Sequence, residues 1–189
     1  MRGRYRLSSP GRRQARRRRW LPLLAVLAAA AAIITGRLIP RWVGPATVQV
    51  FFVRYEGGGH SGTLVPVRHP AKRGEAEERL SSALRDLLAG PTPDERRRGL
   101  TSEIPSGTGL RGVRVGQGIV TVDLTSAFGR GGGSTSMLAR VWQVVYTASQ
   151  LPGTPDVQIL LDGRRVPALG GEGVMIGTPL RRPHAIPVF

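Results

Sequence analysis

The chain has 189 residues, and its 28 Lys and Arg against 12 Asp and Glu give a net charge of +16. Residues 1–43 contain eleven Arg and no acidic residue, which leaves only +5 for residues 44–189. A basic excess confined to one tail describes that tail, so the charge does not by itself indicate a nucleic-acid-binding domain. The absence of Cys excludes a disulfide framework, a thiol nucleophile, a zinc-finger site and a lipid-modified N-terminal Cys.

The N-terminal sequence predicts a segment that targets the protein to a membrane. Residues 1–19 hold nine Arg and form a basic tail, and residues 20–39 are an apolar stretch in which Arg37 is the only charged residue. This length meets the lower limit for a transmembrane helix, and basic residues before such a helix keep the N-terminus in the cytoplasm. We therefore expect a single-pass signal anchor at 20–39, a linker at 40–46, and an extracytoplasmic remainder.

Two other interpretations of this segment stay open. The five consecutive Ala residues at 28–32 offer sites at which a signal peptide is cleaved. The paired Arg residues before Trp20 also permit a twin-arginine export signal. We favour the uncleaved anchor because the apolar stretch continues past the Ala run and ends near Arg37.

The remainder of the chain shows strand and helix patterns in alternation. The expected strands are residues 47–53, 63–67, 110–115, 119–124 and 157–161, and the expected helices are residues 75–89, 92–98 and 134–150. Pro66 indicates an edge strand, and Gly90 and Pro91 end the first long helix. This β-β-α-β-β-α-β order predicts one α+β domain at 47–168, with two main helices packed on a mixed or antiparallel sheet. We expect residues 169–189, rich in Gly and Pro, to be an extended tail that packs only in part.

The sequence contains no recognisable catalytic or metal-binding set, so we expect no metal and no cofactor. His60, His69 and His184 have no metal-ligand spacing, and nothing in their spacing supports a triad with a Ser and an acid. Asp123 lies within a predicted strand, where a carboxylate more often caps a turn or faces solvent than acts in catalysis. One Gly-rich loop opens onto a helix and is either an anion-binding loop or a plain loop followed by a Ser cap. Its residues are Gly129, Arg130, Gly131, Gly132, Gly133 and Ser134.

Two runs of residues carry a family resemblance. They are Leu-Leu-Ala-Gly-Pro-Thr at 87–92 and Ile-Pro-Ser-Gly-Thr at 104–108. Further matching stretches are residues 113–115, 120–125, 143–147, 150–153 and 157–163. With these runs, residues 47–168 resemble the GerMN domain of spore germination and sporulation proteins, a module related to the N-terminal module of LpqB-type lipoproteins.

The resemblance implies a non-catalytic module in the cell envelope, exported and tethered to the membrane. Modules of this kind resemble ring-building domains that pack side by side around a membrane channel. The positions that match the family motif are expected to be mainly structural; they are Gly90, Pro91, Thr92, Glu95, Pro105, Gly107, Asp123, Tyr146 and Thr147. The sequence departs from the family in having no lipoprotein Cys and one domain copy, which leaves the envelope role intact but not a specific sporulation role.

Three functions follow as hypotheses. The first is a membrane-anchored module that binds envelope or sporulation proteins, or further copies of itself, with the strand edge at 63–67 as one pairing surface. The second is a module that binds peptidoglycan or another anionic wall polymer, using the charge of +5 and the loop at 129–134. The third, a wall hydrolase, has only unpaired carboxylates behind it. Nucleic acid is not an expected partner, because the basic tail adjoins a spanning segment and is explained by topology and lipid headgroups.

Overall fold

The computed structural model describes residues 47–57, 61–71, 74–170 and 173–189. The basic tail at 1–19, the expected anchor at 20–39 and the linker at 40–46 lie outside these residues. Among the helices that are described, none has both the length and the apolar character needed to cross a membrane.

The first sheet is antiparallel and has three strands. Strands β1 (Thr47–Glu56) and β2 (Ser61–Pro70) pair along their full length, and the short strand β3 (Leu100–Thr101) pairs with the other edge of β1. The strand order is β2-β1-β3, so β2 is an edge strand as Pro66 predicts.

The second sheet is mixed and has four strands in the order β4-β5-β6-β7. Strands β4 (Leu110–Gly116) and β5 (Ile119–Leu124) form the predicted hairpin. Strand β6 (Asp156–Leu161) runs parallel to β5, and β7 (Leu180–Arg181) closes the sheet. The α+β class is therefore confirmed, but the strands form two sheets instead of the one that the sequence suggested.

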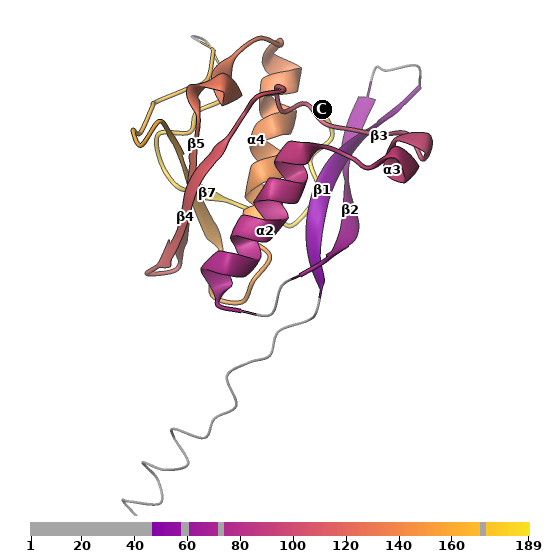
Figure 1. The fold of residues 1–189 in the computed structure, drawn as a ribbon. Coiled ribbons are helices and arrows are strands. Elements are labelled where there is room, and N and C mark those ends of the chain that lie inside the picture. Colours follow the sequence, from indigo (N-terminus) through magenta and orange to yellow (C-terminus); the bar gives the residue numbers. More distant parts are fainter. Residues whose placement is uncertain (1–46, 58–60, 72–73, 171–172) are drawn as a thin grey trace, which may run out of the picture. The chain divides into compact units, whose positions relative to one another are not determined.

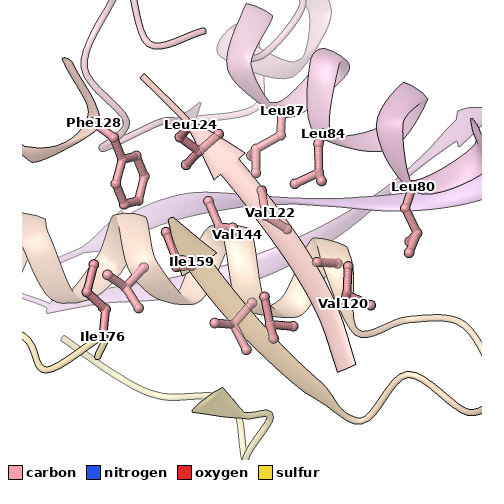
Figure 2. Close-up of a cluster of buried hydrophobic side chains, with 14 of the residues drawn as sticks. Leu80, Leu84, Leu87, Val120, Val122, Leu124, Phe128, Val144, Ile159 and Ile176 are labelled. Carbon is pink, nitrogen blue, oxygen red and sulfur yellow. The ribbon is translucent and has the colours of Figure 1, made fainter. Parts of the chain in front are cut away.

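Two long helices lie between the sheets (Figure 1). They are α2 (Ala76–Ala89) and α4 (Ser134–Ala148), and the short helix α3 (Pro93–Arg97) follows α2. The helix expected at 75–89 is present as α2, and Leu80, Leu84 and Leu87, which share one of its faces, are fully buried. Figure 2 shows these leucines directed toward β5, whose alternate residues are fully buried as well. The main core thus lies between α2, α4 and the second sheet.

Helix α4 is buried on more sides than a surface helix. Ten of its fifteen residues are buried, including the polar Arg140, Gln143 and Thr147. Leu138, between the buried Met137 and Ala139, is only half-buried. Helix α4 contacts both sheets and α2, so its buried residues are not confined to one apolar stripe.

The C-terminal residues belong to the fold more fully than a partly packed tail. Leu169 and Ile176 are buried in the main core, and β7 pairs with β6. Phe189 exchanges two backbone hydrogen bonds with Gly62 of β2. Apolar residues placed between the Gly and Pro residues of this segment supply its anchors, a pattern too irregular to show a helical or strand period.

Candidate functional site

The first group of motif residues forms a helix stop and a helix start. Gly90 ends α2 with a positive φ of 78°, a conformation that Gly adopts without strain. Thr92 then caps α3, because its hydroxyl accepts a hydrogen bond from the Glu95 N–H at 3.3 Å. In return the Glu95 carboxylate accepts from the Thr92 N–H at 2.7 Å, which completes a capping box. Pro91, between Gly90 and Thr92, is buried. This part of the motif is structural.

His69, two residues beyond the strand expected at 63–67, lies at the end of β2 between two carboxylates. The Nδ1 atom of His69 is 3.2 Å from Asp86 on α2, and Nε2 is 3.0 Å from Glu95 on α3. Burial raises the pKa of the Glu95 carboxyl, but hydrogen bonds from Thr92 and His69 outweigh it and hold the pKa below its usual value. Both ring nitrogens are occupied, so His69 ties β2 to α2 and α3 and leaves no nitrogen free to act as a base.

Three further motif positions, Pro105, Gly107 and Asp123, belong to turns or hold one. The Thr108 N–H and hydroxyl both donate to the Pro105 carbonyl, and Gly107 within that turn has a φ of 84°. Asp123 accepts a hydrogen bond at 2.8 Å from the N–H of Gly163 in the turn after β6. Its other carboxylate oxygen lies 3.3 Å from Arg111. The Asp123 carboxylate therefore caps a neighbouring turn.

Residues of the matching stretches 143–147 and 150–153, in α4 and just after it, cover the edge of β1. Gln150 exchanges hydrogen bonds with both the N–H (2.7 Å) and the carbonyl (2.8 Å) of Gln49. Thr147 accepts from the Phe51 N–H, and Gln143 donates to the Phe51 carbonyl at 3.0 Å. Gln143, Thr147 and Gln150 follow the i, i+4, i+7 spacing of one helix face. We call these three residues the polar ladder.

The polar ladder explains why there are two sheets. It satisfies the outward-pointing backbone groups of β1 that another strand would otherwise pair with. Gln143 also accepts from the Glu103 N–H at 2.9 Å, just beyond β3. Tyr146 on the same helix is 1% exposed, with its ring 5.2 Å from that of Phe51, so it belongs to the core.

The Gly-rich loop at 129–134 has a geometry that differs from both expectations. Ser134 is the first helical residue rather than the cap, which is Gly133 without a side-chain hydrogen bond. The Arg140 guanidinium, 2% exposed, donates to the carbonyls of Phe128, Arg130 and Gly131 at 2.9–3.0 Å. An anion-binding loop directs N–H groups to its ligand, whereas these carbonyls converge on a cation. Burial lowers the pKa of Arg140, which the charge of Glu103 partly opposes.

The motif positions do not meet at one site. They are distributed over α2, α3, the turn at 105–108, β5 and α4, and each has a bond or packing partner in the fold. In the part of the chain that is described, no group of three or more His, Cys, Asp or Glu side chains is placed to hold a metal ion.

The expected pairing edge at 63–67 is interrupted. Gly62 already pairs with Phe189, and Thr63 lies opposite Val188. Backbone groups of alternate β2 residues point away from β1, and the position of Gly62 puts Pro66 in this outward set. Proline has no N–H to donate, so a long lateral ladder along this edge is blocked.

A shallow apolar groove lies beside this edge. Its lining comes from the start of α4 and from the C-terminal segment: Ser134, Thr135, Leu138, Gly173, Val174, Val188 and Phe189. The large exposed apolar side chains of the described residues are Met175 (66% exposed), Ile186 (41%) and Val188 (68%). All three belong to the same C-terminal segment. We call the groove and these three side chains the C-terminal apolar surface.

Comparison with known proteins identifies the family. The family model described as "Germane: Sporulation and spore germination" matches residues 49–167, and the chain belongs to this family. It is a GerMN-like protein, as the resemblance in the sequence indicated. A search of the curated proteins finds no match.

Three solved structures share the fold at 18% sequence identity. The tandem GerMN domains of the sporulation protein GerM from Bacillus subtilis give a TM-score of 0.58, covering 74% of this chain and 46% of that one. The first GerMN domain of the same protein gives 0.56, covering 73% and 98%. A predicted lipoprotein from Clostridium perfringens gives 0.53, covering 75% and 90%. The chain thus spans about half of the tandem structure.

Proposed function

We propose that this protein is a membrane-anchored, extracytoplasmic module that binds other proteins during assembly of the cell envelope or spore, without catalysing a reaction. The family and the similarity to domains of a sporulation protein support a role of this kind. The similarity to a predicted lipoprotein supports an envelope location, and the apolar stretch at 20–39 would supply the tether.

The observation that carries the proposal is the C-terminal apolar surface. Exposed apolar side chains scattered singly are normal, whereas a group beside a groove marks an interaction site. Ile186 and Val188 lie two residues apart in an extended segment and so share one of its sides. The groove next to them is lined by Leu138 and Val174. A partner would gain buried apolar area here without disturbing the core.

The bonding of the polar residues supports a non-catalytic role. Both nitrogens of His69 face carboxylates, and Asp123 is held by a turn and by Arg111. A general base or a nucleophile needs an atom directed at the substrate. The alternative of an anionic wall polymer has the +5 charge behind it, but the loop at 129–134 turns carbonyls inward to Arg140.

The test is affinity capture of the tagged full-length protein from its native host, in growing and in starved cells. Val188→Asp places a charge on the C-terminal apolar surface, and Gln117→Asp places the same charge on the exposed β4–β5 turn as a matched control. We expect the wild type and Gln117→Asp to recover the same envelope or spore proteins, and Val188→Asp to lose them. Equal recovery by all three, or sedimentation with purified cell wall and no protein partner, would overturn the proposal.

A further inference from the structure

Residues 182–189 lie along α4, and we call them the strap. The two ends of the strap are held differently. At its root, the guanidinium carbon of Arg182 lies 4.4 Å from the centre of the Tyr146 ring. The Tyr146 hydroxyl lies 3.2 Å from the Pro183 carbonyl and 2.9 Å from the Ala185 carbonyl, so it can donate to either. These contacts combine a cation–π interaction with a hydrogen bond to buried structure.

The tip of the strap, residues 186–189, has much weaker attachments. Its backbone hydrogen bonds to the rest of the fold are the pair that Phe189 exchanges with Gly62, at 2.9 and 3.2 Å. Ile186 and Val188 are 41% and 68% exposed, so the apolar contact that holds the tip comes mainly from Phe189, which is partly buried against the cluster that contains Leu64 and Tyr146. Pro187 has no N–H, which prevents the pairing from continuing along β2. A segment with few buried contacts and few hydrogen bonds opens locally at low cost.

Strand β2, which the tip contacts, has only a short stretch of its outer edge where a further strand can pair. Outward backbone groups on β2 belong to Gly62, Leu64, Pro66, Arg68 and Pro70, by alternation from the Gly62–Phe189 pair. The two prolines cannot donate, so adjacent outward donors remain only at Gly62 and Leu64. Beside them stand the apolar walls of the groove, Leu138 and Val174.

We propose that the tip is a displaceable internal ligand of a strand-addition site, and that an extended apolar segment of a partner protein takes its place. The tip shows what fits: a strand antiparallel to β2 that pairs with Gly62 and lines the groove with apolar side chains. The root stays bound to Tyr146, so displacement needs no unfolding of the core. This inference rests on the proposed function and gives its binding mode.

The first test measures opening of the tip by amide hydrogen exchange in the full-length protein. We expect the Gly62 N–H to exchange about 100-fold faster than the Val50 N–H in the centre of the same sheet, because only the tip protects Gly62. The variant Thr63→Cys/Val188→Cys joins a directly opposed strand pair, and no other Cys is present to compete. When oxidised, it should slow Gly62 exchange toward that of Val50. Equal exchange of Gly62 and Val50 in the wild type would overturn the proposal.

The second test measures exchange of the strap for an external segment. The probe is a labelled peptide with the sequence of residues 183–189, added to the double-cysteine variant in its reduced and oxidised forms. We expect the reduced form to bind the peptide and the oxidised form to lose at least about 10-fold in affinity, since the site is then closed. Equal binding by both forms, or by neither, would overturn the strap mechanism. Partner capture that depends on Val188 would still stand, so the two proposals fail separately.

Discussion

Helix α4 and the strap lie side by side, yet they are built in opposite ways. The polar side chains Gln143 and Thr147 of α4 are fully buried and bonded to the backbone of β1. The strap leaves Ile186 and Val188 exposed and ends in one pair of backbone hydrogen bonds. A buried helix that substitutes for a strand gives a rigid frame, and our proposal makes the strap on its surface a replaceable contact.

The comparison also assigns the family motif to the frame. The matching residues of α4 satisfy β1, and those of α3 form a capping box. None of the motif residues belongs to the C-terminal apolar surface. The motif residues therefore serve the fold, and in the function that we propose the specificity of binding comes from residues outside the motif.

The largest effect should come from breaking the polar ladder. Gln143→Leu keeps the volume of a fully buried side chain but leaves the Phe51 carbonyl and the Glu103 N–H without their partner. Each unsatisfied buried group costs about 1–3 kcal/mol, so we expect the free energy of unfolding to fall by about 3 kcal/mol. Urea denaturation of the full-length protein measures it. A loss below about 1 kcal/mol would show that the ladder does not hold α4 to β1.

A smaller loss is expected from Arg140→Met. This change removes the guanidinium that donates hydrogen bonds to three backbone carbonyls. Water can replace some of these hydrogen bonds, because the loop is at the surface. We expect about 2 kcal/mol of destabilisation and faster amide exchange in the loop at 129–134. Unchanged exchange in that loop would contradict the role given to Arg140.

The capping box should contribute less than either. Thr92→Ala removes the hydroxyl that accepts from the Glu95 N–H, and a cap of this type is worth about 1 kcal/mol. Thr92→Ser keeps the hydroxyl and serves as the control. Equal melting curves for the Ala and Ser variants would show that the cap is not formed.

Lowering the pH should reduce the stability that the capping box contributes through Glu95. The pKa of Glu95 is lowered in the folded protein from its ordinary value of 4.5, so its contribution to stability is present above that value and is lost as the pH falls through the folded pKa. Glu95→Gln cannot ionise, and its unfolding free energy should depend less on pH below about 4.5. Parallel pH profiles for the wild type and the variant would contradict this account.

The smallest effect on stability should come from the strap tip. Val188 is 68% exposed, so Val188→Asp is expected to change the free energy of unfolding by less than about 0.5 kcal/mol. Thermal melting beside Gln117→Asp measures the difference. A loss as large as that of Gln143→Leu would show that the tip belongs to the frame.

Local signals in the sequence predicted the local structure well. The helix at 75–89 and the strand at 119–124 were predicted from their patterns and are present as α2 and β5, and Thr92, at the start of the expected short helix, is its cap. The contacts of His69 could not be predicted, because its partners lie 17 and 26 residues away on other elements. The polar ladder did leave a signal, because a Gln, a Thr and a Gln recur at i, i+4, i+7 among the apolar residues at the end of α4 and just after it. This spacing alone could not identify the partner strand β1, because β1 is about a hundred residues distant in the sequence.

Two features required the folded chain itself. The division into two sheets depends on α4 occupying the edge of β1, which no periodicity reports. The strap has no regular spacing of apolar residues, so its packing against Tyr146 and its pairing with Gly62 follow only from the tertiary structure.

The most direct test of a rigid frame with a replaceable contact is site-specific photocrosslinking in living cells. A photoreactive residue placed at Val188 should join the protein to one defined envelope or spore protein. The same residue at Arg114, exposed on β4, should capture none. Identical products from both positions, or no product from Val188 in growing or starved cells, would contradict the account.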